Sequence, residues 1–412
     1  MIYKRSSGMR RIRACAAVLI VGIAAAGLPA RSESQPASGR TLAELKAEAQ
    51  ARADRNAYPL IGLKAGEVRE ALERLTSLDR DEWAASWSLL GDRYMVKGRS
   101  ELASAPAEAN KNFLLAWHYY SFARWPVPNS PGKQRAYEKA LEAYLAHAKL
   151  MDPPLEILRV PFEGKEIVGY VRMPRGARAA PLVVAIAGLD SRKEEMVERF
   201  SPLLERGIGI LALDSPGTGQ SPVKAAPGAE RTLNLTLDAV LRRPDVDARR
   251  VAVYGGSFGG YWATILAVTE KDRVRAVVVQ SPPIHESFVR ARTEALAGNR
   301  EYLFDYVPAQ MHTYGAVTME RLVEAREQLS LKTRGLLGKP MAPMLVIGGA
   351  LDTQVPIADI DLLLRSGQAP KDLWVHPQGG HMGRDAKDWR DPVIFKRVTT
   401  PWLLRGLDES AN

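Results

Sequence analysis

The segment Val251-Ala-Val-Tyr-Gly-Gly-Ser-Phe-Gly-Gly-Tyr261 decides the fold. An apolar strand runs into a glycine-rich turn around Ser257, and a helical pattern starts directly after it. A serine on so sharp a turn has a strained backbone and close neighbours, which glycines on both sides tolerate. Strand, tight turn and helix are the context of a nucleophile elbow. The segment therefore predicts a serine nucleophile, and the alternative is a turn that only caps a helix.

Short apolar segments alternate with helical ones on both sides of this turn. Near-continuous apolar strands separated by helices indicate a mostly parallel sheet with helices on both faces. We therefore predict an α/β-hydrolase fold, with a β-hairpin at residues 155–162 and 167–173 before the parallel strands. The other expected strands are Leu182–Ala187, Gly207–Leu213, Val251–Tyr254, Val274–Gln280, Met344–Ile347 and Leu373–His376.

Two regions depart from this alternation. Residues 41 to about 150 have helical periodicity after a polar lead-in at 31–40, and Thr41 and Glu44 have the spacing of a capping box. We therefore predict an all-helical N-terminal domain over residues 31–153. The hydrolase domain then spans residues 154–412. Within it, residues from about 284 to 340 are helical and polar and interrupt the strands. This pattern predicts a helical insertion over the carboxyl edge of the sheet, where α/β proteins bind ligands.

The first thirty residues have the pattern of a secretory signal peptide. Five cations precede an apolar run, Ala14 to Leu28, that ends in small residues. The run is short for a membrane span, and the alternative is an uncleaved anchor. Removing residues 1–30 lowers the formal charge from +10 to +5 and removes the single cysteine, which excludes cysteine nucleophiles and disulfides from the mature chain. We expect a periplasmic or secreted protein without a stable membrane span after cleavage.

A serine nucleophile needs a histidine base and an acid that orients the histidine. In this fold the acid follows a late strand and the histidine comes last. Asp352 lies just past the expected strand Met344–Ile347, and His381 lies in the loop after the last strand. The chain has six histidines, and His381 fits the position of the base best. We predict Ser257, Asp352 and His381 as the catalytic residues.

An oxyanion hole is expected from backbone N–H groups near the nucleophile. One is that of Phe258, and the other should come from the loop after the strand Leu182–Ala187, where we choose Leu189. In that loop Ser191 and Glu194 have capping-box spacing, so a helix is expected to start there.

Four further residues are expected to line the substrate pocket. Gly188 stands at the predicted oxyanion loop, Tyr261 follows the nucleophile, and His285 and Glu286 follow the end of a strand. His285 and Glu286 are placed to supply an extra acid. The four are Gly188, Tyr261, His285 and Glu286.

Other classes of function have little support. The basic residues are scattered and lack interleaved aromatic residues, which argues against nucleic-acid binding. The glycine-containing turn Asp214–Ser221 lacks the lysine of a phosphate-binding loop. No metal or cofactor motif is visible, so we expect neither, and a small molecule is the expected partner. The oligomeric state is left open, with a homodimer as one option.

Several segments resemble one family of α/β-hydrolases. It groups 2,6-dihydroxypseudooxynicotine hydrolase, fungal polyketide-shortening pigment hydrolases and FrsA-like esterases, and the resemblance covers roughly residues 65–405. Ala187 stands where the family usually has a glycine, which leaves the N–H of Leu189 available. The matching segments are Ala-Trp-His-Tyr-Tyr (116–120), Val160–Gly164, Gly169–Arg172, Gly188-Leu-Asp-Ser-Arg-Lys-Glu-Glu195 and Gly256–Tyr261.

The resemblance implies a Ser257–Asp352–His381 triad and a substrate bound between the helical domain and the sheet. Members cleave either an ester or a C–C bond beside an aryl or polyketide ketone. We therefore expect a serine hydrolase that forms an acyl-enzyme with one of these substrates. The alternatives are a prolyl-oligopeptidase-like peptidase, whose elbow is similar, and a non-enzymatic helical scaffold on a hydrolase fold.

Overall fold

The computed structural model describes residues 39–367, 370–384 and 388–408, and the predicted signal peptide lies outside them. Within these ranges no helix has both the length and the apolar character needed to cross a membrane. Contacts group residues 35–412 into one compact unit.

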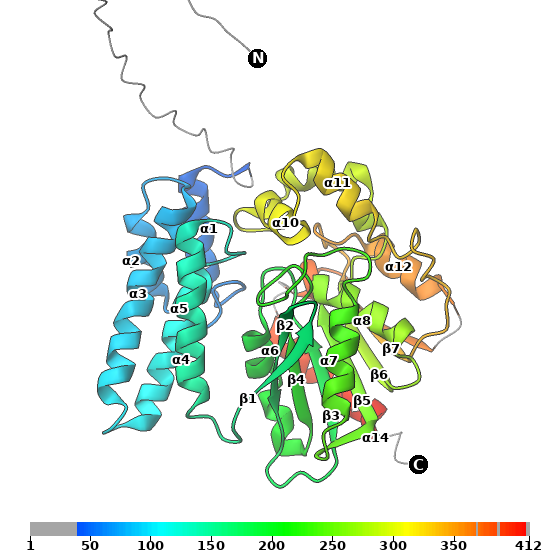
Figure 1. Cartoon of the computed structure of the whole chain (residues 1–412). Helices are drawn as coiled ribbons and strands as arrows, with labels where there is room; N and C mark the ends of the chain where they lie inside the picture. Colours follow the sequence, from blue (N-terminus) through cyan, green and yellow to red (C-terminus); the bar gives the residue numbers. More distant parts are fainter. Residues whose placement is uncertain (1–38, 368–369, 385–387, 409–412) are drawn as a thin grey trace, which may run out of the picture. The chain divides into compact units, whose positions relative to one another are not determined.

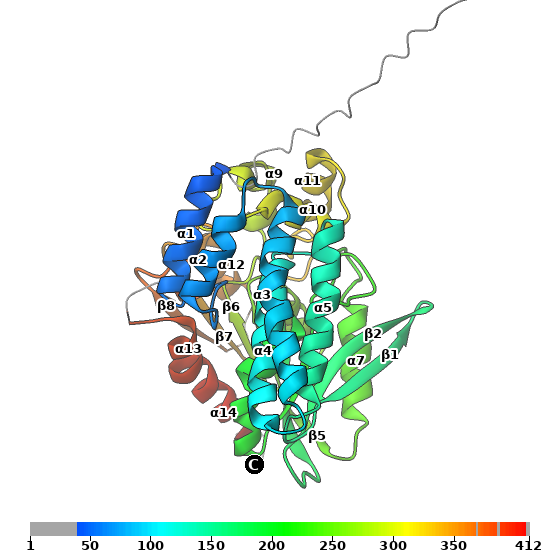
Figure 2. The same cartoon turned by 90° about the vertical axis from the view of Figure 1, so that its left-hand side faces the viewer.

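The N-terminal region consists of helices, as predicted (Figure 2). The capping box forms, since the Thr41 side chain accepts the N–H of Glu44 and the Glu44 carboxylate accepts the N–H of Thr41. The longest helix, Arg80–Glu101, packs along the two helices that follow it. Its Gly91 lies so close to the ring of Tyr120 that a Cβ would not fit there. The helices are α1 (Leu42–Asp54), α2 (Ala65–Arg74), α3 (Arg80–Glu101), α4 (Pro106–Ala123) and α5 (Pro131–Ala148).

The remaining described chain forms an eight-stranded sheet in the order β1-β2-β4-β3-β5-β6-β7-β8. The hairpin β1–β2 is antiparallel and β2 is antiparallel to β4, while all other pairs are parallel. Every expected strand is present, which confirms the predicted fold class. The strands are β1 (Glu156–Phe162), β2 (Lys165–Arg172), β3 (Ala180–Ile186), β4 (Gly209–Leu213), β5 (Val246–Gly256), β6 (Ala276–Gln280), β7 (Met344–Gly349) and β8 (Lys371–His376).

Helices cover both faces of this sheet (Figure 1). The helices α7 and α8 lie on one face, and α6 and α14 lie on the other. Because both faces are covered, β4, β6 and β7 are wholly buried, as is β5 from Val251 onward, and β3 is buried except at one residue. The helices are α6 (Lys193–Phe200), α7 (Arg231–Leu241), α8 (Phe258–Thr269), α12 (Ile357–Arg365), α13 (Asp391–Ile394) and α14 (Thr400–Asp408).

The helical insertion lies between β6 and β7, as predicted. It packs on the helical region through the buried carboxylate of Asp305, which accepts hydrogen bonds from Arg80 at 2.9 Å, Asn129 at 2.8 Å and Lys133 at 3.0 Å. This contact fixes the insertion against the N-terminal helices. The insertion contains α9 (Arg290–Glu294), α10 (Tyr306–Tyr314) and α11 (Met319–Glu327), with short 3-10 turns at Glu286–Phe288 and Ala295–Gly298.

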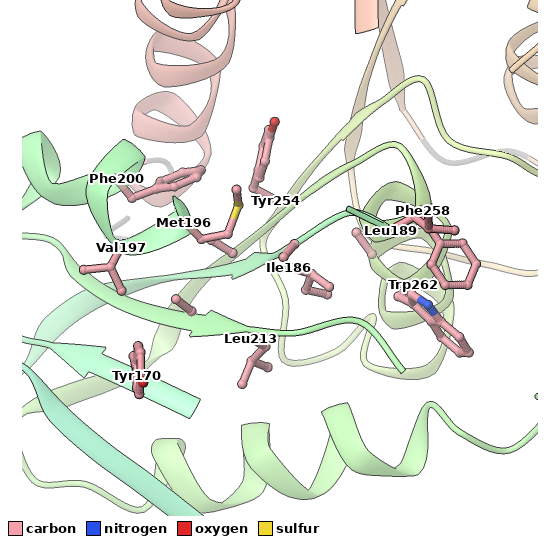
Figure 3. Close-up of a cluster of buried hydrophobic side chains, with 14 of the residues drawn as sticks. Tyr170, Ile186, Leu189, Met196, Val197, Phe200, Leu213, Tyr254, Phe258 and Trp262 are labelled. Atoms are coloured by element: carbon pink, nitrogen blue, oxygen red, sulfur yellow. The ribbon is translucent and has the colours of Figure 1, made fainter. Parts of the chain in front are cut away.

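One hydrophobic core runs from the N-terminal helices into the sheet. Figure 3 shows part of it around β3 and α6, where the rings of Phe200 and Tyr254 are 5.1 Å apart. The change from helices to strands falls between Ala148 and Glu156, beside the predicted boundary at residue 153. The helical region therefore differs in structure from the sheet but shares its core.

Candidate active site

Ser257 occupies a strained turn between β5 and α8. Its φ of 52° and ψ of −123° lie outside the regions that serine ordinarily adopts. Close packing explains the glycines around it, because a Cβ on Gly255 would lie 2.1 Å from the oxygen of Gly259. A Cβ on Gly259 would lie 2.4 Å from the oxygen of Ile186. The backbone therefore holds the serine in a conformation that larger neighbours would not permit.

Asp352 and His381, predicted from their positions after β7 and β8, lie together in the structure. Asp352 Oδ2 is 2.9 Å from His381 Nδ1, and both side chains are almost fully buried. The other carboxylate oxygen accepts the N–H groups of Gln354 and Val355 at 2.9 and 2.8 Å. The carboxylate is thus fixed by its own loop and hydrogen-bonds the Nδ1 edge of the imidazole.

The two groups shift each other's pKa. Burial alone would raise the pKa of Asp352, but the neighbouring His381 and the backbone N–H groups hold it below its ordinary value. Burial alone would lower the pKa of His381, but Asp352 outweighs burial and raises it above the ordinary value. The pair therefore favours a charged carboxylate beside a histidine that accepts a proton readily.

A carboxylate of the insertion supports the histidine loop. Glu301 Oε1 accepts the N–H of His381 at 2.5 Å, and Glu301 Oε2 accepts the N–H of Thr353 at 3.0 Å. Helix α1 reaches the same residue, since Arg52 donates to the carbonyl of Glu301 at 2.8 Å. Glu301 thus joins the loops that carry His381 and Asp352. It belongs to no motif and lies 80 residues before His381, so periodicity and spacing did not reveal it.

The predicted oxyanion loop follows β3. The N–H of Gly188 donates to the hydroxyl of Ser191 at 2.7 Å, and the next residue, Leu189, lines the cavity beside Ser257. The expected start of α6 was wrong by one residue, because Arg192 is the N-cap and Glu195 Oε1 accepts its N–H at 3.2 Å. The hydroxyl of Ser191 bonds within the loop instead of capping the helix.

A cavity of about 780 Å³ opens at this edge of the sheet. Ser257, Leu189, Phe258, Gly188 and His381 all line it. Its walls come from the helical region, the oxyanion loop, the insertion and the loops after β7 and β8. A volume of this size suits a small-molecule ligand. The aromatic residues in the walls are Tyr58, Trp125, Tyr254, Phe258, Phe288, Tyr302, Tyr306 and Tyr314.

Three expected pocket residues lie outside this cavity, and the prediction for them is corrected. Tyr261 is fully buried beneath the elbow, and its hydroxyl accepts a hydrogen bond from Arg334 at 2.9 Å. His285 Nδ1 is 2.8 Å from the hydroxyl of Ser330, which holds the ring within the insertion. The Glu286 side chain is 45% exposed and does not line the cavity. The strand end that carries His285 and Glu286 turns away because Asp359 binds its backbone N–H groups.

Two carboxyl groups in or just after the predicted oxyanion loop, those of Asp190 and Glu195, line the cavity in place of Glu286. Burial raises the pKa of Glu195 to about 7, although Arg124 lies 3.4 Å away. Asp190 lies near the hydroxyls of Tyr58 and Tyr302, and its charge adds to burial in raising the pKa of both phenols. Across the described ranges, no group of three or more His, Cys, Asp or Glu residues is arranged to hold a metal ion.

The sheet, the elbow and the cavity define an enzyme of the α/β-hydrolase class. A family model described as "Esterase FrsA-like" matches residues 69–379, and the chain belongs to this family. Esterase FrsA of Yersinia pestis (strain Pestoides F) is 29% identical over 282 residues, which are 67% of each chain. Esterase FrsA of Yersinia pseudotuberculosis (strain IP 31758) matches to the same extent.

Two solved structures share the fold. The 2,6-dihydroxy-pseudo-oxynicotine hydrolase superposes with a TM-score of 0.70 at 21% identity, over 84% of this chain and 93% of that one. AbyA5 superposes with a TM-score of 0.70 at 20% identity, over 90% of this chain and 95% of that one. Both alignments extend beyond the sheet, so these structures share more with the chain than its hydrolase core.

Proposed function

We propose that the protein is a serine esterase that cleaves a small carboxylic ester through Ser257, His381 and Asp352. The hydrogen bond between Asp352 and His381, in a cavity that Ser257 also lines, carries this proposal. The family match to esterases supports an ester as the substrate. Among the described residues Ser257 makes no hydrogen bond to His381, and such contacts often tighten only when substrate binds.

In this mechanism His381 takes the hydroxyl proton of Ser257 as the oxygen attacks the ester carbonyl. The N–H groups of Leu189 and Phe258 stabilise the oxyanion of the tetrahedral intermediate. The intermediate collapses to an acyl-enzyme, and His381 returns the proton to the departing alcohol. Water then attacks the acyl-enzyme by the same steps, releases the acid and restores Ser257.

A ketone-activated C–C bond is the second candidate substrate. Its leaving group departs as a carbanion, which needs a proton or electron delocalisation. Glu195 supports this candidate, because it lines the cavity and burial raises its pKa to about 7, so it holds a proton for part of the time at neutral pH. Esters remain the first candidate because they require no such extra acid.

Labelling with a fluorophosphonate probe tests the nucleophile. The wild-type protein should be labelled at Ser257, and Ser257→Ala should not react. A folded wild-type protein that resists the probe would favour the scaffold alternative. A panel of p-nitrophenyl esters, aryl β-diketones and proline-containing peptides then separates esterase, C–C hydrolase and peptidase activity. Turnover of the peptides alone would refute the esterase proposal.

The pH dependence of kcat/KM should follow His381. The base must be neutral, and Asp352 raises the pKa of His381 although burial opposes this. We therefore expect kcat/KM to increase with pH through an inflection above the ordinary histidine value of about 6.5, and then to level off. Initial rates with a p-nitrophenyl ester, corrected for spontaneous hydrolysis, measure the profile. A rate that falls over this range would contradict the assignment.

Glu301 is expected to act as a positioning residue for His381. Glu301→Gln replaces one carboxylate oxygen with an amide N–H, so one of the two backbone contacts is lost. We expect kcat/KM to decrease about tenfold, because a hydrogen bond to a charged group contributes roughly that factor in free energy. The inflection of the pH profile should move to lower pH, because the charge of Glu301 helps to raise the pKa of His381. Glu294→Gln, on an exposed part of the insertion, is the matched control. An unchanged inflection would show that Glu301 has only a structural role.

We also propose that the protein is exported, on the pattern of residues 1–30. Fractionation of expressing cells and sequencing of the mature N-terminus test this. The expected result is a periplasmic or secreted chain that begins near residue 31. A full-length chain in the cytoplasm would contradict it.

A further inference from the structure

We infer that the esterase cavity holds a binding site for an anionic group of the substrate, formed by Arg326 and Gln310 of the insertion. The substrate would thus be an ester that also carries a carboxylate. This inference rests on the proposed function and specifies its substrate class. The family match and the structural relatives assign no such group.

Arg326 is a buried cation that faces the cavity. It is 5% exposed and lines the cavity together with Gln310, Ser287 and Tyr314. Its guanidinium donates to the hydroxyl of Thr293 at 3.0 Å, to Gln310 Oε1 at 2.5 Å and to the carbonyl of Ser287. These three acceptors are neutral. A buried charge without an opposite charge is costly, so an anionic ligand would stabilise this site.

No described carboxylate lies within ion-pair distance of Arg326. Two buried lysines are paired, Lys133 with Asp305 and Lys193 with Asp214. The buried Arg172 and Arg192 resemble Arg326, since among the described residues they form no ion pair and donate to backbone carbonyls. The two phenols near Arg326 supply no negative charge. Burial raises the pKa of Tyr306 and of Tyr314 to about 12, even though the charge of Arg326 opposes the rise. Both phenols therefore stay neutral at physiological pH.

The guanidinium retains donors for a ligand. Arginine has five N–H groups, and the hydrogen bonds to Thr293, Gln310 and Ser287 leave one N–H on each terminal nitrogen. The hydroxyl of Tyr314 also lies within hydrogen-bond reach of the guanidinium and would share these donors with a ligand. Two such donors match the two oxygens of a carboxylate. Arg40 also lines the cavity and has no carboxylate partner among the described residues, but its terminal nitrogens donate to three backbone carbonyls of the insertion.

The site lies close to the predicted nucleophile. The guanidinium carbon of Arg326 is 5.7 Å from the centre of the Tyr314 ring, and that ring is 5.8 Å from the ring of Phe258. Phe258 follows Ser257 directly. One aromatic side chain therefore separates the anion site from the elbow, so the carboxylate of the substrate should lie several bonds from the ester carbonyl.

The charge of the cavity walls also favours an anion. Eight arginines line the cavity, against five acidic residues. Three of these acids are already paired, since Glu48 contacts Arg52, Asp391 contacts Arg199 and Glu195 contacts Arg124. An excess of one sign in a cleft raises the local concentration of ligands of the opposite sign.

Two esters of equal acyl length test the site: p-nitrophenyl monoadipate, which carries a carboxylate, and p-nitrophenyl hexanoate, which does not. The wild-type enzyme should prefer the monoadipate. Arg326→Met should lower this preference at least about tenfold, mainly by raising KM for the monoadipate. A tenfold change corresponds to the usual contribution of a hydrogen bond to a charged group. Arg326→Lys should restore part of it. Arg290→Met, at an exposed ion pair outside the cavity, should leave it unchanged. An unchanged preference in folded Arg326→Met overturns the inference.

Binding to the Ser257→Ala form provides a measurement without turnover and without altering Arg326. Calorimetry should show monomethyl adipate binding at least about tenfold more tightly than methyl hexanoate, with an affinity that falls as salt increases. Equal affinities overturn the inference even if Arg326→Met fails to fold. If the wild-type enzyme hydrolyses neither p-nitrophenyl ester while Ser257→Ala prefers monomethyl adipate, the proposed esterase activity fails and the anion site stands.

Discussion

Asp352→Asn is expected to lower kcat by about four orders of magnitude. In the proposed mechanism the carboxylate accepts the proton of His381 Nδ1, which lies 2.9 Å away, and Nε2 accepts the proton of Ser257. An asparagine can turn its amide N–H toward Nδ1 and so stabilise the wrong tautomer of the ring. It also removes the charge that raises the pKa of His381.

Steady-state rates with a p-nitrophenyl ester measure this effect, and circular dichroism verifies that the variant is folded. Asp361→Asn is a suitable control, because Asp361 lies on α12 close in sequence and forms an exposed ion pair with Arg365. We expect this control to retain the wild-type kcat. A folded Asp352→Asn variant within about tenfold of the wild-type kcat would show that Asp352 does not orient the base, since orientation by such a carboxylate is worth far more.

Lys193→Met is expected to lower the free energy of unfolding by about 3–5 kcal/mol, the usual effect of removing one partner from a buried ion pair. Lys193 Nζ is fully buried, 2.9 Å from Asp214 and 3.0 Å from Glu194. Methionine fills a similar volume but leaves both carboxylates without their cation. The backbone N–H of Lys193 also donates to Asp214, which ties the start of α6 to the end of β4.

Urea unfolding followed by circular dichroism measures the loss. Lys271→Met is the control, because its ion pair with Asp272 is exposed, and it should change stability by less than about 0.5 kcal/mol. Burial would raise the pKa of Asp214, but Lys193 holds it below its ordinary value. The contribution of Asp214 is therefore present above the ordinary carboxyl pKa and is lost as pH falls through the lowered one. A loss below about 1 kcal/mol at neutral pH would mean that water reaches the site.

Local sequence signals predicted the sheet and the elbow well. The strands are short apolar runs bounded by turn residues, and each appears within a few residues of its expected place. The glycines around Ser257 signal a turn that the structure confirms by its positive φ. Chain order in this fold predicted Asp352 and His381 as partners of Ser257, and the structure places these two side chains 2.9 Å apart. These features depend on neighbouring residues or on a fixed topology.

The pocket was harder to predict because its walls come from distant parts of the chain. His285 and Glu286 stand at a strand end that usually lines such a site. Their backbone N–H groups instead donate to Asp359 on α12, and their side chains lie outside the cavity. Tyr261 follows the elbow, yet the rise of α8 carries its side chain under the turn. Arg326 and Glu301 have no local pattern that marks them, because their roles depend on how the insertion folds over the sheet.

The sequence by itself determined the order of strands and helices and the strained turn at Ser257, and it predicted two partners for this serine. Hydrophobic periodicity and glycine spacing record such features because they arise from interactions between residues close along the chain. Only the tertiary structure decided which side chains meet in the cavity. Folding brings Glu301 to the N–H of His381 across 80 residues, and it leaves Arg326 buried beside the elbow without a described carboxylate partner. Burial and charge pairing of this kind depend on long-range packing, which no short segment encodes.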